Sequence, residues 1–324
     1  MIMIYEQSSS LQQRVRELTR REPSARMKVF EDTTQFMSID VGNVLRLAGN
    51  DYLIIGHARE GRFGIDDQPK FWVKTCIDLE TGLKKIIKLV FLETFDNKVA
   101  DTVYRFLRSP EKEASVLLSM QGHQNFMQGH PVRDTAGNIA RIIDFISGPS
   151  LFDYLRGLNM SHREYYNTEF LTVMKRFIQS ARAISLLHEK GLHHGDIRAD
   201  HIIIHNQTQD YMWIDFDYEV SNREYDVLCL GNVLQQVVGK GRHSINDIQE
   251  HPENYPDFRG TLTSPDMSLM FRYRVANLQK LYPHIPDTMN DIVMRFSDGS
   301  SNLYKSADNL VFDLCSLFPE MAGY

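Results

Sequence analysis

Two aspartates beside neighbouring apolar runs constrain the fold of this chain more than any other feature. Asp196 precedes the apolar run at residues 202–204 by a short polar stretch, and Asp215 lies inside the run at 212–216. The polar residues 205–210 between the runs are typical of a turn, so the two runs are expected to pair as a β-hairpin. Such a hairpin predicts that the two carboxylates lie at strand ends that face one cleft.

The residues around both aspartates resemble motifs of the protein-kinase-like superfamily. Residues 194–201, HGDIRADH, are similar to the catalytic loop of that family, and residues 214–217, IDFD, are similar to its magnesium-binding motif. The resemblance implies that Asp196 orients the attacking hydroxyl and that Asp215 holds the metal that bridges the nucleotide phosphates. Phosphoryl transfer suits such a site because it needs positioning and charge neutralisation more than covalent chemistry.

The bulk properties fit one large domain or two lobes. A chain of 324 residues that is 42% hydrophobic can bury a full core, and its net charge of -6 argues against a nucleic-acid binder that works by bulk electrostatics. Cys76, Cys229 and Cys315 match no disulfide or metal-ligand spacing, which favours buried thiols in a reducing compartment. No apolar run is long enough to span a bilayer and the N-terminus lacks a secretion signal, so we expect a cytoplasmic location.

Three parts are expected along the chain. Residues 1–40 form an N-terminal extension, residues 41–146 a small nucleotide-binding lobe, and residues 147–324 a larger catalytic lobe. In the extension, the apolar residues between 11 and 18 have helical spacing, arginines surround them, and Pro23 ends the pattern. A basic amphipathic helix of this kind either packs on its own domain or binds a partner or a membrane.

The small lobe has the pattern of an antiparallel β-sheet. Residues 44–55 are expected to form a hairpin that turns at Gly49 and Asn50, and residues 73–91 a second hairpin that turns at 80–82. The resemblance places the lysine that binds the α- and β-phosphates on the strand that ends this second hairpin. Lys88 occupies that place.

The segment between the two hairpins is similar to a kinase glycine-rich loop. Its residues Gly61, Phe63 and Gly64 would bring backbone N–H groups close to phosphate oxygens, because glycine lets the backbone approach a ligand. The ordinary structural alternative is a glycine-rich hairpin end. Residues 65–70 then resemble an insertion at the point where the second strand of the family would normally begin.

A helix is expected to begin at Pro110, and in the family such a helix supplies the glutamate that pairs with the phosphate-binding lysine. Glu113 fits that role because it lies four residues before the apolar Leu117, and Glu111 is the alternative. Residues 139–146 then resemble the fifth strand and the hinge, whose backbone groups hydrogen-bond adenine, with Ile143 as the gatekeeper. The resemblance therefore implies a nucleotide pocket that includes Ile86, Ile143, Asp144, Phe145, Ile146 and Ile203.

The second lobe has mostly helical patterns. Apolar residues between 170 and 187 predict a long core helix, and further helices are expected at 267–281, 288–296 and 306–317. Asp226 opens a run that resembles the buried helix whose first aspartate anchors the catalytic loop. Only eight residues, Tyr218 to Tyr225, separate this run from the metal motif, so the usual activation segment has almost no room. This shortness weakens the case for an extended peptide as substrate.

Four residues depart from the pattern of the family. His201 stands where an asparagine normally binds the second magnesium, as in heptose kinases of lipopolysaccharide core, and a neutral imidazole can ligate a metal. Gly195 replaces the usual arginine, Asp217 replaces a flexible glycine and adds a carboxylate, and Ile86 replaces the small alanine that covers adenine. One retained residue favours catalysis. Arg198 lies two residues after Asp196, where the family has a cation that neutralises charge on the transferred phosphate.

These features imply an α+β, bilobal, protein-kinase-like fold, with a small antiparallel sheet lobe carrying one helix and a larger, mainly helical lobe. The leading hypothesis is an enzyme that uses ATP and Mg²⁺ or Mn²⁺ to phosphorylate a hydroxyl group on a protein serine or threonine or on a small molecule. Its expected catalytic residues are Asp196, Arg198, Lys88 and Glu113, and its expected metal ligands are Asp215, His201 and Asp217.

Two alternatives stay open. The first is a pseudokinase, a scaffold that uses the same fold to hold a nucleotide or a protein partner. The second takes His194, Asp196 and either His201 or His205 as a metal triad like that of non-haem iron oxygenases. The plainer interpretation of His194 is a buried residue that hydrogen-bonds the backbone.

Overall fold

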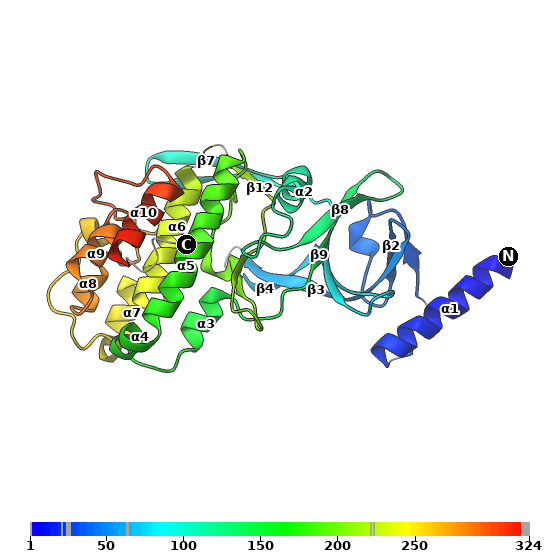
Figure 1. The fold of residues 1–324 in the computed structure, drawn as a ribbon, viewed down its shortest axis with the longest axis horizontal. Helices are drawn as coiled ribbons and strands as arrows, with labels where there is room; N and C mark the ends of the chain where they lie inside the picture. The colour runs from blue at the N-terminus through cyan, green and yellow to red at the C-terminus, as the bar shows by residue number, and fades with distance from the viewer. Residues whose placement is uncertain are drawn as a thin grey trace. The chain divides into compact units, whose positions relative to one another are not determined.

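The computed structural model divides the chain into two compact units (Figure 1). Unit 1 comprises Met1–Leu92, Ser109–Gln121 and Met127–Phe145, and unit 2 comprises Glu93–Arg108, Gly122–Phe126 and Ile146–Tyr324. The structure describes residues 2–20, 22–23, 27–62, 65–220, 222 and 224–318.

Unit 1 is built on a seven-stranded sheet with the strand order β1-β2-β3-β4-β5-β9-β8. Neighbouring strands are antiparallel except β1 and β2, which run parallel. The strands are β1 (Val29–Phe30), β2 (Val44–Leu47), β3 (Asn50–Arg62), β4 (Ile65–Asp78), β5 (Lys84–Lys88), β8 (Gly129–Arg133) and β9 (Ile139–Asp144). The helices are α1 (Ile2–Thr19), the short η1 (Phe36–Ser38) and α2 (Pro110–Ser119). The branched side chains of Leu45, Ile54, Ile87 and Ile142 are all buried in one apolar cluster of this sheet.

The N-terminal helix α1 packs on unit 1. Val15 is 3% exposed and lies in a cluster with Val44, Leu53 and Leu79, against which Leu11 and Leu18 also pack. Arg14 adds two hydrogen bonds, from Nε to the Leu79 carbonyl at 2.7 Å and from Nη2 to the Glu80 carbonyl at 2.8 Å. The apolar stripe expected from the sequence therefore contacts the sheet of its own unit.

The first hairpin turns one residue earlier than the sequence suggested. Leu47 pairs with Asn50, so the two turn residues are Ala48 and Gly49, with φ of 51° and 86°. A two-residue turn with positive φ at both positions matches the twist of the flanking strands, and glycine adopts such a φ without strain. The predicted turn at Gly49 and Asn50 was wrong because Asn50 already belongs to β3. The second predicted hairpin, between β4 and β5, is confirmed.

The segment expected to resemble a glycine-rich loop is the end of the long β3–β4 hairpin. Arg62 pairs with Ile65, and register shifts interrupt the ladder near Gly56, Ala58 and Glu60. Gly61 lies in β3, whereas Phe63 and Gly64 lie outside the described residues. Residues 65–70 are part of β4, so the expected insertion before that strand is replaced by a strand that starts earlier.

Unit 2 is mainly helical. Its helices are α3 (Leu151–Gly157), α4 (His162–Thr168), α5 (Phe170–Glu189), α6 (Glu224–Gly239), α7 (Ile245–Glu250), α8 (Leu278–Leu281), α9 (Asp287–Met294) and α10 (Ala307–Leu317), with the short η2 (Ala199–His201), η3 (Pro252–Asn254) and η4 (Ser264–Asp266). Helix α5 buries the apolar face predicted for it, including Val173, Phe177 and Ile184. Strands β10 (Ile202–Ile204) and β11 (Tyr211–Trp213) pair antiparallel, which confirms the predicted hairpin between the two aspartates.

A second β-element of unit 2 was not foreseen. Strands β6 (Thr94–Val99) and β7 (Thr102–Arg108) form a hairpin, and β12 (Tyr218–Val220) pairs with β7 to complete a three-stranded sheet. Tyr104, Phe106 and Arg108 of β7 are buried while the residues between them are exposed. The sequence does not display this alternation, because the exposed positions include Val103 and Leu107 and one buried position is Arg108.

The helix expected at 267–281 is wrong over most of its length. Only α8 is helical there, because the backbone around it is held in an irregular conformation by Asp266. The Asp266 carbonyl accepts hydrogen bonds from the Ala276 and Asn277 N–H groups, and its carboxylate accepts from the Asn277 side chain at 2.8 Å. The helices near 288–296 and 306–317 are present as α9 and α10.

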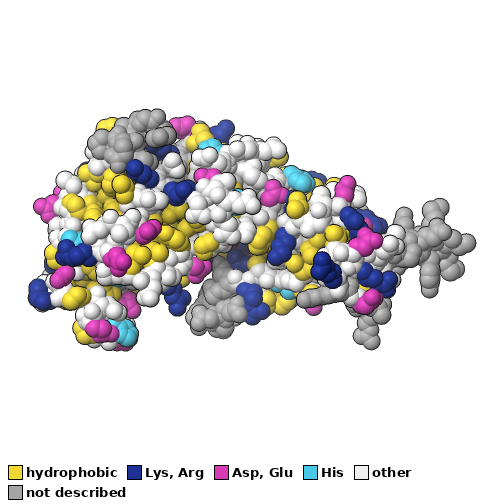
Figure 2. All heavy atoms as spheres, turned by 60° about the horizontal axis from the view of Figure 1, so that its bottom comes forward, with side chains coloured by type: hydrophobic (Ala, Val, Ile, Leu, Met, Phe, Trp, Pro, Cys, Tyr) yellow, Lys and Arg dark blue, Asp and Glu magenta, His cyan; other side chains and the backbone are white. Residues whose placement is uncertain are grey.

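The predicted fold class is confirmed: the chain is α+β, with a sheet unit that carries helix α2 and a second, mainly helical unit. No helix among the described residues has both the length and the apolar character needed to cross a membrane. On the face drawn in Figure 2, acidic and basic side chains of the described residues are interspersed.

Candidate functional site

Unit 1 contributes a buried group of three charges. The Lys88 ammonium lies 2.6 Å from Oε1 of Glu113, and Nε of Arg141 lies 3.1 Å from Oε2 of the same carboxylate. The exposed fractions of Lys88, Glu113 and Arg141 are 5%, 0% and 1%. One carboxylate therefore serves two cations away from water.

Local sequence explains how these three residues meet. Lys88 ends β5 and pairs in register with Arg141 of β9, while Glu113 stands in the first turn of α2. That helix begins where it does because the Ser109 side chain accepts a hydrogen bond from the Lys112 N–H and proline occupies the first helical position. Glu111, the alternative partner, is exposed.

Arg141 was missed at the level of sequence. Its Nη1 donates to the Leu89 and Ile139 carbonyls at 3.2 and 3.1 Å, so the guanidinium ties two strands to the Glu113 carboxylate. The sequence shows only an arginine between apolar residues, and its burial, which requires a charged partner, becomes visible in the structure.

In unit 2, the loop that contains Asp196 is anchored by Asp226 at the start of α6. The Asp226 carboxylate accepts hydrogen bonds from the His194 and Gly195 N–H groups at 2.7 and 2.8 Å and from Nε2 of His188 at 2.9 Å. Burial by itself raises the pKa of Asp226, but the hydrogen bond from His188 and the nearby histidines outweigh it and hold the pKa well below its ordinary value. Gly195 has a φ of 85°, so an arginine at this position would be strained.

Replacing Asp226 by asparagine is expected to lower the free energy of unfolding by about 1.5–3 kcal/mol at pH 7, because a charged acceptor of three hydrogen bonds is lost. Since the folded-state pKa is depressed, the wild-type contribution is present above the ordinary value of 3.8 and is lost as the pH falls below it. Urea unfolding at a series of pH values between about 3 and 7 measures this difference. The exposed Asp291→Asn is the control, and equal losses in both variants would contradict the prediction.

His201 lies between Asp196 and Asp215, the two aspartates on either side of the predicted hairpin turn. Its Nδ1 lies 2.8 Å from the Asp196 carbonyl oxygen and 3.5 Å from Oδ2 of the same residue, and its Nε2 lies 3.6 Å from Oδ2 of Asp215. The ring is buried, whereas the Asp196 and Asp215 side chains are 23% and 15% exposed. The two carboxylates are therefore brought together on opposite edges of one imidazole.

The hydrogen bond to the carbonyl determines how this imidazole can act. Nδ1 must carry a proton to donate to the Asp196 carbonyl, so Nε2 of the neutral ring carries a lone pair that faces the Asp215 carboxylate. Two acceptors in this position need a proton or a cation between them. Two ligand atoms that each lie about 2.1 Å from one Mg²⁺, at right angles to each other, are about 3 Å apart. The 3.6 Å between Nε2 of His201 and Oδ2 of Asp215 is close to that separation.

Asp217, the third expected metal ligand, faces a different partner. Its carboxylate forms an ion pair with Nη1 of Arg108 on β7, and both side chains are at most 3% exposed. Arg108 also hydrogen-bonds the Tyr218 hydroxyl, lies 3.3 Å from Glu93, and places its guanidinium 4.3 Å from the centre of the Tyr218 ring. We therefore do not retain Asp217 as a metal ligand, because its charge is already neutralised by Arg108.

Arg198 is likewise engaged within its own loop. Its Nε and Nη2 lie 3.2 and 2.6 Å from the two carboxylate oxygens of Asp200, a bidentate pair. Burial raises the pKa of Asp200, but the interactions with His201 and Arg198 outweigh it, and the pKa lies below its ordinary value. In this arrangement Asp200 neutralises the cation that was expected to act on phosphate.

The alternative metal triad does not assemble. The His194 ring packs 4.4 Å from Phe216 and 5.3 Å from Trp213, measured between ring centres, and its Nδ1 accepts a hydrogen bond from the Asp196 N–H. Nδ1 of His205 contacts the Thr208 hydroxyl instead. Across the part of the chain that the structure describes, no three His, Cys, Asp or Glu side chains are arranged to hold a metal ion.

The residues expected to contact the nucleotide base are divided between the units. In unit 1, Ile143 is buried and pairs with the half-buried Ile86 on β5, while Asp144 pairs with Lys85 and Phe145 is 43% exposed. In unit 2, Ile146 and Ile203 are half-buried. Gly129 lies opposite Ile143, and a Cβ there would come within 2.3 Å of the Ile142 carbonyl, so only glycine fits.

Comparison with curated proteins finds similarity to protein kinases in two cases. The chain is 26% identical over 132 residues to the "Probable serine/threonine-protein kinase fhkC" of Dictyostelium discoideum, a match that covers 41% of this chain and 20% of that protein. It is 24% identical over 99 residues to the "Putative ribosomal protein S6 kinase alpha-2" of Caenorhabditis elegans, covering 31% of this chain and 12% of that protein. The resemblance to the protein kinases is confirmed.

Two further findings accompany this resemblance. No family model matches the chain. Among solved structures, the kinase domain of Mycobacterium tuberculosis PknI aligns with 85% of this chain and 97% of its own length, at 12% identity and a TM-score of 0.48. The matched segments are a fifth or less of the two curated kinases, so the activity and substrates of this kinase-like chain are matters for proposal.

Proposed function

We propose that the chain is a kinase that uses ATP and Mg²⁺ to transfer the γ-phosphoryl group to a hydroxyl-bearing acceptor. The observation that carries this proposal is the position of Nε2 of His201, which faces Asp215 at 3.6 Å while the other edge of the same ring contacts Asp196. A metal-binding pair thus adjoins a partly exposed carboxylate that can act on a hydroxyl. The charged group of unit 1 supports the same conclusion.

Each residue has a distinct part in the proposed reaction. Asp215 and His201 would hold Mg²⁺, which, when bound, neutralises charge on the nucleotide phosphates. Lys88, which pairs with Glu113, would bind the α- and β-phosphates. Asp196 orients the acceptor hydroxyl and takes its proton as the oxygen–phosphorus bond forms and the bond to ADP breaks.

A pseudokinase scaffold is the second candidate. It is favoured by the bidentate pair between Arg198 and Asp200, which neutralises a cation otherwise expected to stabilise the transferred phosphate. The two candidates differ in one property that can be measured. A kinase must bind a metal–nucleotide complex, whereas a scaffold that binds no nucleotide does not.

Thermal unfolding in the presence of Mg²⁺ and a non-hydrolysable ATP analogue tests the proposal. At about 100 times its dissociation constant, the complex is expected to stabilise the wild-type protein by about 2.7 kcal/mol. Asp215→Asn is expected to lose most of this shift, because it removes a charged ligand of the metal, and His201→Ala is expected to reduce it. Asp291→Asn, on an exposed position of α9, should shift as the wild type does.

The matching activity measurement follows ADP release with a set of protein and small-molecule acceptors. If neither Mg²⁺ nor Mn²⁺ with any nucleotide stabilises the wild-type protein, the kinase proposal fails and the scaffold takes its place. Equal shifts in the wild type and in Asp215→Asn would remove Asp215 from the metal site.

A further inference from the structure

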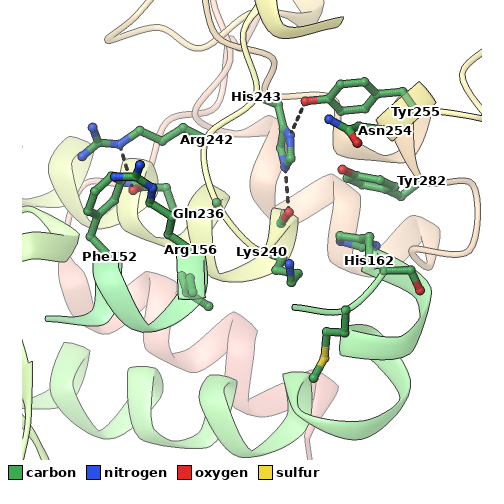
Figure 3. A pocket seen from close by; sticks show the side chains of 15 residues that line it. Phe152, Arg156, His162, Gln236, Lys240, Arg242, His243, Asn254, Tyr255 and Tyr282 are labelled. Atoms are coloured by element: carbon green, nitrogen blue, oxygen red, sulfur yellow. Dashed lines mark hydrogen bonds between the residues drawn. The ribbon is translucent and has the colours of Figure 1, made fainter. Parts of the chain in front are cut away.

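Unit 2 contains a cavity that the proposed reaction does not use (Figure 3). Its volume is about 500 Å³, within the size of pockets that hold small molecules. The lining comes from helices α3 and α4 and the residues between them, the end of α6 and the residues that follow it, Asn254, Tyr255 and Tyr282. In Figure 3, Arg242, Phe152 and Arg156 lie at one end, Tyr255, Tyr282 and His162 lie at the other, and Lys240 lies between them.

The charges of this cavity have one sign. Arg156, Lys240 and Arg242 line it, and none of its lining residues is an aspartate or glutamate. Within the described part of the chain, the side chains of Arg156 and Lys240 form no hydrogen bond or ion pair. Arg242 donates from Nε to Oε1 of Gln236 at 3.1 Å and stacks 4.4 Å from the centre of the Phe152 ring, which orients its guanidinium without neutralising it.

The opposite wall is uncharged and held in place by hydrogen bonds. His243 contacts the Tyr255 hydroxyl through Nδ1 at 3.0 Å and the Gly239 carbonyl through Nε2 at 2.7 Å. His162 stacks on Tyr282 with 3.6 Å between ring centres, and Nε2 contacts the Val238 carbonyl. Burial lowers the pKa of His243 and, together with nearby positive charges, lowers the pKa of His162 to about 3. Both rings are therefore neutral at pH 7.

The cavity borders the catalytic turn. Helix α3, which carries Phe152 and Arg156, packs against η2, the turn that contains Asp200 and His201. Burial lowers the pKa of Arg242, and the charges of Arg274 and Arg198 lower it further, whereas the charge of Asp200 raises it. Arg242 therefore interacts electrostatically with residues of the catalytic loop. A group bound at the cationic end of the cavity would thus lie beside helix α3, the helix that packs against this turn.

We propose that this cavity binds the phosphate or carboxylate group of a small hydroxyl-bearing acceptor, with Arg156, Lys240 and Arg242 as the residues that bind the anion. Two arginines and a lysine in a lining that contains no Asp or Glu favour a compact anion, because each can form charge-assisted hydrogen bonds to its oxygens. The aromatic wall suits the uncharged remainder of the molecule. The acceptor role rests on the proposed function, whereas binding of the anion does not.

The binding test needs no nucleotide. Met160 lines the cavity, so its methyl resonance in protein labelled with [ε-¹³C]methionine, assigned with Met160→Leu, reports on occupancy. Glycerol 3-phosphate is expected to shift this resonance saturably, and glycerol is not. Arg156→Gln/Arg242→Gln should raise the dissociation constant at least about tenfold. Lys190→Gln/Lys305→Gln changes the net charge equally at exposed positions and should stay within about twofold of the wild type.

Two results would overturn the binding site: a Met160 resonance that does not respond to glycerol 3-phosphate or inorganic phosphate, or equal weakening by both double variants, which would indicate bulk charge. The acceptor role is tested separately with any alcohol that the protein phosphorylates. Arg156→Gln/Arg242→Gln should raise the KM of that acceptor at least about tenfold and leave the KM of ATP unchanged. An unchanged acceptor KM would overturn the acceptor role. If the protein phosphorylates no alcohol, the proposed function fails, but the Met160 resonance should still shift because binding of the anion does not depend on activity.

Discussion

Asp196→Asn is expected to lower the rate of phosphoryl transfer by about 10²–10⁴-fold while nucleotide binding is retained. Asparagine keeps the size of the side chain but cannot take a proton from the acceptor hydroxyl. The backbone carbonyl of residue 196, to which His201 donates, is unchanged by the substitution, so the edge of the imidazole that we propose binds the metal should remain in place. The measurement is the single-turnover rate of ADP formation, with the affinity for the metal–nucleotide complex measured separately by calorimetry.

Asp101→Asn is the matched control, because this aspartate is exposed in the turn between β6 and β7. Its rate should equal that of the wild type. A wild-type rate in Asp196→Asn would show that another group takes the proton and would remove Asp196 from its proposed role. Loss of both transfer and nucleotide binding would indicate that the residue shapes the loop instead.

Glu113→Ala is expected to lower the free energy of unfolding of unit 1 by about 3–5 kcal/mol. The loss is large because two buried cations, Lys88 and Arg141, share this carboxylate and would remain uncompensated without it. Glu111→Ala, on the same helix but exposed, should change stability by at most about 0.5 kcal/mol. Comparison of the two variants distinguishes the loss of a buried, paired carboxylate from the loss of any glutamate in the first turn of α2.

The two tryptophans allow this effect to be assigned to one unit. Trp72 lies in unit 1 and Trp213 in unit 2, and both are buried. Urea unfolding followed by ¹⁹F NMR of 5-fluorotryptophan therefore reports on each unit separately. The prediction fails if Glu113→Ala and Glu111→Ala have the same midpoint at Trp72, or if the change is confined to Trp213.

Features that depend on short stretches of sequence were predictable. The β10–β11 hairpin and the buried face of α5 follow from alternation and helical spacing over a few residues, and both are present. The contact between Lys88 and Glu113 followed from the resemblance, which supplies a pairing that spacing alone does not contain. Motif positions and local periodicity thus indicated where the charged residues would stand.

Features that depend on distant partners were not predictable. Arg108 and Asp217 are 109 positions apart, and nothing near Asp217 in the sequence indicates that a hairpin strand will neutralise it. Arg141 was overlooked because an arginine between apolar residues is consistent with several orientations. The helix expected at 267–281 failed for a related reason: the hydrogen bonds of one aspartate outweighed an apolar spacing that also suits irregular backbone.

The pairing of β12 with β7 has a consequence for how this chain can be controlled. Many kinases are switched by a segment that passes between disordered and ordered states. Here the residues directly after 214–217, Tyr218–Val220, form a strand, and the ion pair between Arg108 and Asp217 ties residues 214–217 to the same hairpin. Control by ordering and disordering of this segment would therefore require the β7–β12 pairing to break first.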